Sequence, residues 1–244
     1  ACDVVMTCLP SPAVCEIVLS ECLSAMRPGS IWIENSTLGR DEIVKLAAMA
    51  QAKGIRVLEA PVTGGVHLAA RGEITVLAGG EKVLFDEMTP VLEAIGNRLF
   101  HMGPIGSAAI IKVITNMLAF IHLKADAEAL MLAKRGGVVL AQAWRAVKAS
   151  AGDSFVHETE GALILNGSYD IACNIDLALK DLGFALHFGQ EFGVPLELAS
   201  ATKQTYVAAK AAYGGTAESP MIAKLLEDLL KTDLRAPGFP ARLE

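Results

Sequence analysis

Lys112 and Asn116 are the pair of residues in this chain best suited to chemistry. Both lie in a mostly apolar stretch that begins at Ile110, and its length without a breaker before Gly136 predicts a helix. A spacing of four residues places the ammonium and the amide on one helix face. One interpretation is that Lys112 extends to solvent and Asn116 caps a neighbouring group. The other is a pair that polarises a substrate in a cleft, because burying these groups without partners is costly.

Thr63-Gly64-Gly65 is a second candidate, because it follows a predicted strand over residues 55–59. Consecutive glycines let a ligand approach the backbone closely, and their N–H groups can face an anion. An ordinary turn at a strand exit would have the same sequence. A threonine nucleophile would need a neighbouring base, and nothing fixes the geometry of His67, so acyl transfer is disfavoured.

Lys180-Asp181 is a third candidate, since Lys180 breaks an apolar helical stripe in the second half of the chain. A solvated helix charge is the alternative interpretation. The five histidines lack the spacing of metal ligands, so no metal site is predicted. No Gly-x-Gly-x-x-Gly motif occurs, so these residues alone carry no dinucleotide fingerprint.

The composition favours a folded protein that binds a small molecule. Apolar residues make up 52% of the 244 residues and charged residues 20%, which suffices for a large core. The net charge of −6 argues against nucleic acid or an anionic membrane as a partner. Polar residues or glycine interrupt every long apolar run, so no uninterrupted run reaches the length that spans a membrane. The cysteine spacing differs from that of a zinc site, and their odd number, five, suits reduced thiols in the cytoplasm.

The first hundred residues alternate between strand and helix patterns. Strands are expected at residues 3–9, 31–35 and 55–59, with helices at 13–26 and 40–53 between them. Ligands of such doubly wound sheets bind beyond the carboxyl ends of the strands, which here are Leu9-Pro10, Ser36-Thr37 and the segment to Gly65. A short helix at 66–71, a strand at 73–78, a helix at 81–96 and a strand at 98–102 complete this part.

After Gly103 only helical patterns follow, punctuated by glycines. The predicted helices are 107–135, 138–150, 153–165, 175–193, 195–213 and 219–231. We therefore predict an α/β Rossmann-type sheet domain over residues 1–102 and an all-helical domain over residues 103–244, entered by a long helix from about residue 107.

These pieces together resemble the β-hydroxyacid dehydrogenase superfamily, which includes 3-hydroxyisobutyrate dehydrogenase and tartronate semialdehyde reductase. The matching segments occur in the family's order over nearly the whole chain. They are Asp3–Pro10 with its Leu-Pro cofactor loop, Glu34–Thr37 at the next strand end, Ala60–Gly65 with Gly72 and Gly79-Gly80 as the substrate loop, Gly103–Gly106 with Lys112 and Asn116 as the catalytic helix, and Lys180-Asp181 near the nicotinamide.

The resemblance implies an NAD(P)-dependent oxidoreductase acting on the CH–OH group of a small β-hydroxyacid, of the 3-hydroxyisobutyrate or 2-hydroxy-3-oxopropionate type. It also implies a homodimer or homotetramer. It makes Lys112 the catalytic residue, whose ammonium would stabilise the alkoxide that develops during hydride transfer. By the same resemblance Thr63, Gly64, Gly65 and Asn116 would bind the substrate, and Leu9, Pro10, Thr37 and Lys180 would contact NAD or NADP.

The sequence departs from the family pattern at a few positions. Ala108 stands where the family has a second glycine, Thr115 replaces the first asparagine of a pair, and Thr63 replaces the commoner serine. The added methyl group of Thr63 is expected to alter the shape of the substrate that fits. The family's glycine-rich β-α-β unit, roughly sixty residues, is expected upstream of Ala1.

Two other functions compete with the dehydrogenase. An imine reductase would share the architecture, but related imine reductases generally lack a lysine at the position of Lys112. A non-catalytic, dehydrogenase-like interaction module would keep the fold without the chemistry. The joint presence of Lys112, Asn116, Thr63 and Lys180 argues against that loss of function.

Overall fold

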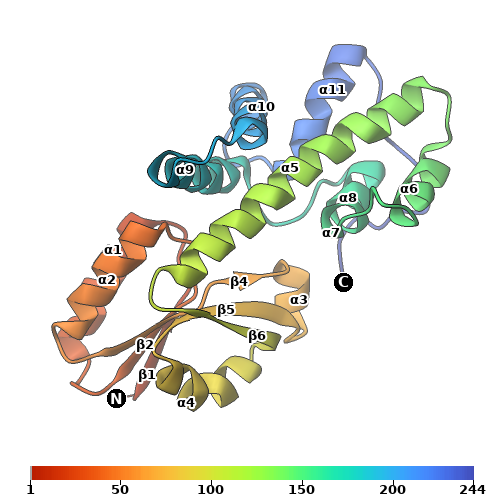
Figure 1. Ribbon diagram of the computed structural model, residues 1–244. Coiled ribbons are helices and arrows are strands. Elements are labelled where there is room, and N and C mark those ends of the chain that lie inside the picture. Colours follow the sequence, from red (N-terminus) through yellow and green to blue (C-terminus); the bar gives the residue numbers. More distant parts are fainter. Residues whose placement is uncertain (1) are drawn as a thin grey trace. The chain divides into compact units, whose positions relative to one another are not determined.

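The computed structural model describes residues 2–244, so Ala1, where the predicted first domain begins, lies outside the described residues. The chain forms two compact units, one ending at Thr115 and the other comprising Asn116–Glu244 (Figure 1). The boundary between the units falls inside one continuous helix, α5 (Ser107–Arg135).

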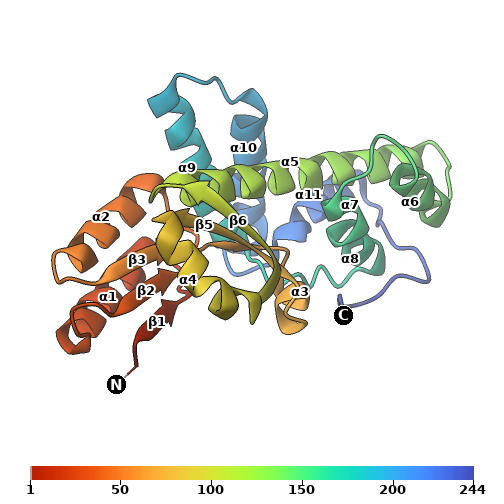
Figure 2. The ribbon, with the colours of Figure 1, turned by 60° about the horizontal axis from the view of Figure 1, so that its bottom comes forward.

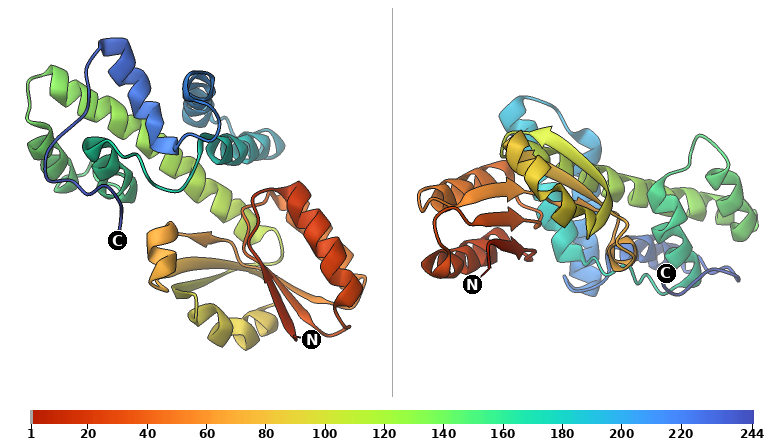
Figure 3. Two further views of the ribbon diagram at one scale, coloured as in Figure 1. Left: turned by 180° about the vertical axis from the view of Figure 1, so that it is seen from behind. Right: turned by 90° about the horizontal axis from the view of Figure 1, so that it is seen from below.

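The first unit is a sheet covered by helices on both faces (Figure 3). Successive side chains of a strand point to opposite faces, so Trp32 packs with α1 and α2 while Ile33 packs with α4. Its elements are β1 (Val4–Thr7), α1 (Pro12–Ala25), β2 (Ile31–Glu34), α2 (Arg40–Gln51), β3 (Arg56–Glu59), β4 (Val62–Thr63), α3 (Val66–Ala70), β5 (Ile74–Gly80), α4 (Lys82–Glu93) and β6 (Gly96–Gly103).

The sheet changes direction after its third strand. Strands β1, β2 and β3 are parallel neighbours, as the β-α-β-α-β pattern predicts. Strand β5 then pairs antiparallel with β3 and with the short strand β4, which the sequence analysis did not anticipate. Strand β6 pairs parallel with β5. The sheet is therefore mixed, and β1, β2 and β3 form the parallel part that the sequence pattern predicts.

Within residues 116–244 the regular elements are all helices, apart from one isolated β-bridge. Helices α9 and α10 lie side by side (Figure 2). After α5 the order is α6 (Leu140–Lys148), α7 (Phe155–Glu158), α8 (Glu160–Asn166), α9 (Ile175–Phe192), α10 (Glu197–Tyr213), the 3₁₀ helix η1 (Ser219–Met221) and α11 (Ile222–Leu230).

One predicted helix, residues 153–165, is broken into α7 and α8 at Thr159. The backbone there has φ −100° and ψ −79°, outside the usual α-helical values. The hydroxyl of Thr159 donates a hydrogen bond of 2.7 Å to the carbonyl oxygen of Phe155. The same type of bond joins Thr205 to Ala201 inside the unbroken helix α10, so the bond alone does not account for the break, and the pattern of apolar residues does not predict it.

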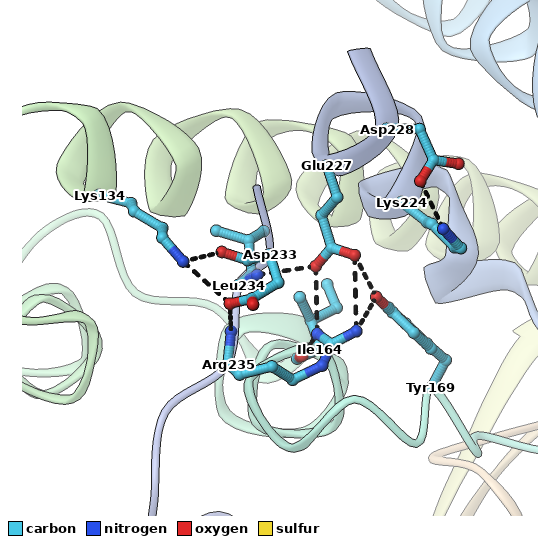
Figure 4. Close-up of polar contacts among 9 residues, drawn as sticks. All are labelled: Lys134, Ile164, Tyr169, Lys224, Glu227, Asp228, Asp233, Leu234 and Arg235. Carbon is cyan, nitrogen blue, oxygen red and sulfur yellow. Dashed lines mark hydrogen bonds and ion pairs between the residues drawn. The ribbon is translucent and has the colours of Figure 1, made fainter. Parts of the chain in front are cut away.

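A buried carboxylate fastens the C-terminal tail to the helical unit (Figure 4). Glu227 accepts hydrogen bonds from the Leu234 backbone at 2.9 Å and from the Tyr169 hydroxyl at 2.8 Å. Arg235 pairs with Glu227 at 3.1 Å and donates to the Ile164 carbonyl oxygen at 2.9 Å. The tail after α11 is thereby held against α8.

Helix α5 is long and apolar enough to cross a membrane by length and composition alone, with a mean hydropathy of 1.5 in its most apolar window. The core helices of water-soluble proteins meet the same criterion, so this one helix is weak evidence for a membrane-spanning segment.

Candidate active site

A buried hydrogen-bond network shapes the carboxyl ends of β1 and β2. Glu34, 1% exposed, accepts from the Thr7 hydroxyl at 2.7 Å and from the Ser36 backbone N–H at 2.6 Å. The Ser36 hydroxyl in turn accepts from the backbone N–H of Leu9 at 2.7 Å. The predicted cofactor residues Leu9 and Pro10 are thus tied to the loop that carries Thr37.

Lys112 lies in the first part of α5 and is only 7% exposed, so it does not extend into solvent. Its charge acts on the thiol of Cys8, at the carboxyl end of β1. Burial and the Glu34 carboxylate raise the pKa of Cys8, and the Lys112 ammonium opposes them. The helix start one turn before Lys112 is bonded to Glu59 at the carboxyl end of β3, the edge of the sheet at which ligands of such sheets bind.

The start of α5 is held by a carboxylate from β3. Glu59 accepts hydrogen bonds from the backbone N–H groups of Gly106 at 2.6 Å, Ala108 at 2.9 Å and Ala109 at 3.2 Å. The first N–H groups of a helix have no partner within it, and a negative charge there also interacts favourably with the helix dipole. Glu59 thereby fixes the end of the helix on which Lys112 lies.

The Thr63-Gly64-Gly65 segment leaves β4, where Thr63 pairs with Thr75 of β5. Gly64 has φ 129° and Gly65 φ 84°, values that favour glycine over other residues. A side chain at Gly65 would also approach the His67 ring to 3.2 Å. The backbone of this segment is therefore shaped in a way that only glycines readily permit.

In the helical unit, Asp181 brings two predicted residues together. Its buried carboxylate accepts a hydrogen bond from the Asn116 amide at 2.7 Å and lies 2.9 Å from the Lys180 ammonium. The same ammonium lies 5.3 Å from the centre of the Phe184 ring. Asn116 and Lys180, 64 positions apart in the sequence, are thus held by one side chain.

The predicted residues fall into two groups. The sheet unit holds Lys112, the Leu9-Pro10 and Thr37 loops and the Thr63–Gly65 segment, and the helical unit holds Asn116 with Lys180. The sequence analysis missed Glu59, and it named Glu34 only as the start of a strand-end segment and not as a buried carboxylate. Their only signal is an acidic residue at the end of an apolar strand, which also occurs at ordinary strand exits.

Two family models match the chain in succession. Residues 1–103 match the NAD binding domain of 6-phosphogluconate dehydrogenase. Residues 106–239 match the family described as NAD-binding of NADP-dependent 3-hydroxyisobutyrate dehydrogenase. The chain belongs to the β-hydroxyacid dehydrogenase superfamily. The predicted family, the fold class and the cofactor, NAD or NADP, are thereby confirmed.

Curated relatives agree with this family. The chain is 30% identical to 2-(hydroxymethyl)glutarate dehydrogenase of Eubacterium barkeri over 233 residues, which cover 94% of this chain and 77% of that one. It is 33% identical to L-threonate dehydrogenase of Escherichia coli O6:H1, covering 81% of this chain and 66% of the relative. It is an NAD(P)-dependent oxidoreductase of the hydroxyacid dehydrogenase type.

Among solved structures, a dehydrogenase matches the chain better than an imine reductase does. The crystal structure of 3-hydroxyisobutyrate dehydrogenase from Salmonella typhimurium matches with a TM-score of 0.86 and 30% identity, over 91% of this chain and 79% of that one. An imine reductase from Myxococcus stipitatus matches with a TM-score of 0.54 and 16% identity, over 92% and 80% of the two chains. The latter likeness shows a shared fold alone.

Proposed function

We propose that this protein transfers hydride between a nicotinamide cofactor and a small β-hydroxyacid or its semialdehyde, with Lys112 as the catalytic residue. The observation that carries the proposal is the burial of Lys112 one helical turn after the start of α5, which is bonded to Glu59 at the carboxyl end of β3. A lysine ammonium at this place can stabilise the alkoxide that forms when a carbonyl gains hydride.

Each of the chain's own residues has a role in this proposal. Lys112 donates a hydrogen bond to the substrate oxygen and stabilises the charge that develops there. The same side chain passes the proton that the oxygen gains or loses. The backbone N–H groups of the Thr63-Gly64-Gly65 segment and the Thr63 hydroxyl bind the substrate carboxylate, and Asn116 binds a second polar group of the substrate.

The cofactor, when bound, supplies the hydride. The loops that carry Leu9, Pro10 and Thr37 are positioned to bind a nucleotide. They follow parallel strands, and the carboxyl ends of such strands form the binding edge of the sheet. Lys180, held by Asp181, supplies a positive charge for the same cofactor. We place the protein in the cytoplasm, where its cysteines stay reduced and NAD and NADP are available.

Replacing Thr63 or Asn116 with alanine is expected to raise KM for the acid substrate more than it lowers kcat. Each side chain is proposed to bind a part of the substrate that does not change charge during the reaction, so its loss weakens ground-state and transition-state binding together. Steady-state kinetics on the full-length protein measures both constants. Asn97→Ala, an exposed position in β6, is the matched control and should behave as the wild type. Unchanged KM in both test variants would exclude them from substrate binding.

We also propose that the protein forms a homodimer or homotetramer. Only 33% of the most apolar window of α5 is buried, and Leu118 and Leu132 are 44% and 75% exposed. Apolar surface of this kind on one helix is typical of a subunit interface. Light scattering at micromolar concentration is expected to give a multiple of the chain mass. A monomeric mass would contradict the assembly but leave the chemistry untouched.

A further inference from the structure

Glu59 is one of the most completely buried charged groups of the sheet unit. It is 1% exposed and accepts all three of its hydrogen bonds from backbone N–H groups at the start of α5. Both carboxylate oxygens are used, Oε1 by Gly106 and Ala108 and Oε2 by Ala109. Every partner is a donor, so the ionised carboxylate satisfies the arrangement and a protonated one would lack an acceptor.

Glycine at position 79 makes room for this carboxylate. Gly79 is the residue paired with Glu59 across the β3–β5 ladder. A side chain at Gly79 would overlap with the Oε1 atom of Glu59. The carboxylate is therefore confined from the β5 side and directed toward the start of α5.

Glu59 also connects two parts of the proposed site through the chain. Toward its C-terminal side, the backbone continues through Ala60 and Pro61 into β4 and the Thr63-Gly64-Gly65 segment. Through its side chain, it holds the N–H groups of Ala108 and Ala109, which lie one helical turn before Lys112. The strand that leads to the proposed carboxylate site thus anchors the helix that carries the proposed catalytic ammonium.

We propose that Glu59 is a positioning residue of the reaction, which sets the place of Lys112 relative to the Thr63-Gly64-Gly65 segment by anchoring the start of α5. This inference rests on the proposed role of Lys112. A small displacement of a catalytic group is enough to matter, since a misplacement of about 1 Å can cost about a hundredfold in rate.

The neutral amide of glutamine cannot replace this carboxylate. Its NH₂ group would face a backbone N–H where an oxygen now accepts a hydrogen bond. Burial raises the pKa of Glu59 to about 7, and the three N–H donors act in the opposite direction. Assays at about pH 8 therefore compare an ionised Glu59 with the neutral amide.

The test is Glu59→Gln, made alone and together with Lys112→Ala in the full-length protein. We expect Glu59→Gln alone to lower kcat roughly tenfold to a hundredfold with KM changed much less. In the Lys112→Ala background the same substitution is expected to change kcat by less than about twofold, because a residue that acts through Lys112 has nothing left to position. A merely structural role would give equal losses in both backgrounds and would overturn the proposal.

Glu87→Gln is the matched control, because it removes the same charge from an exposed ion pair with Arg56. Its kcat should equal that of the wild type. Should Glu59→Gln fail to fold, Gly79→Ala displaces the carboxylate without changing its charge and should lower kcat in the same manner. Hydrogen exchange at the backbone N–H groups of Ala108 and Ala109 should be faster than in the wild type in Glu59→Gln and in Gly79→Ala.

The outcomes separate the two proposals. Wild-type turnover in Lys112→Ala would remove the catalytic assignment and, with it, the role of Glu59. Lost turnover in Lys112→Ala together with kcat within about twofold of the wild type in folded Glu59→Gln or Gly79→Ala would remove only the role of Glu59.

Discussion

Lys112→Ala is expected to lower kcat by roughly two to four orders of magnitude while the protein stays folded, the usual contribution of a positioned acid or electrostatic group. Lys112 is buried one helical turn after the start of α5, which Glu59 holds at the carboxyl end of β3, and we propose that its ammonium stabilises the negative charge that develops on the substrate oxygen. Steady-state kinetics measures the loss, and circular dichroism confirms the fold.

The controls separate the charge of Lys112 from its chemistry. Lys112→Arg should not restore full turnover, because a guanidinium does not give up its proton at working pH. Lys45→Ala, which removes an exposed lysine paired with Glu16, should leave turnover unchanged. Turnover in Lys112→Ala within about fivefold of the wild type, roughly 1 kcal/mol in the barrier, would end the case for Lys112 as the catalytic residue.

His157→Ala is expected to destabilise the helical unit by about 3–5 kcal/mol, the cost of leaving a buried charge without its partner. The Nδ1 atom of His157 lies 2.5 Å from the Asp126 carboxylate, and Nε2 lies 2.9 Å from the Trp144 carbonyl oxygen. Both side chains of the ion pair are buried, with 1% and 6% exposed. Because both ring nitrogens face acceptors, the doubly protonated imidazolium fits this place.

The same pair makes the helical unit sensitive to pH. Burial alone would lower the pKa of His157, but the hydrogen bonds to Asp126 and to the Trp144 carbonyl outweigh it, so the pKa is raised. A raised histidine pKa stabilises the fold fully below about pH 6.5, the unfolded value. That contribution is lost as the pH rises through the folded-state pKa.

Urea denaturation, monitored by the hydrogen exchange of residues 140–166, measures the free energy of unfolding of the helical unit alone. This choice is needed because two units need not unfold together. His122→Ala, an exposed position on α5, is the matched control and should change the free energy of unfolding by less than about 0.5 kcal/mol. A His157→Ala variant as stable as this control, with an unchanged pH dependence, would contradict the assignment of a charged His157.

The helices were largely predictable because residues close in the sequence determine where each helix begins and ends. The predicted range of α5, residues 107–135, agrees with the structure, since Gly106 precedes it and Gly136 follows it. The antiparallel pairing of β5 was not predictable, because strand direction depends on a partner elsewhere in the chain. The break at Thr159 was missed because the pattern of apolar residues continues through it.

The predicted site residues, Asp181 among them, lie in motifs, whereas the hydrogen-bond partners that hold the site span long sequence distances. The partners of Glu59 lie 47 to 50 positions further along the chain. The hydrogen bond between Asn116 and Asp181 spans 65 positions. The sequence around Glu59 and around Asp181 has no local pattern that predicts a backbone or amide partner. Only the folded chain shows which elements these two side chains hold.

The most direct test of the central claim is the turnover of the full-length protein with a panel of small β-hydroxyacids, followed by the absorbance of NADH or NADPH. The account predicts reduction of NAD or NADP with at least one β-hydroxyacid that carries a free carboxylate, and a loss of that activity in Lys112→Ala. Folded protein that reduces neither cofactor with any member of the panel, or that turns over imines instead, would contradict it.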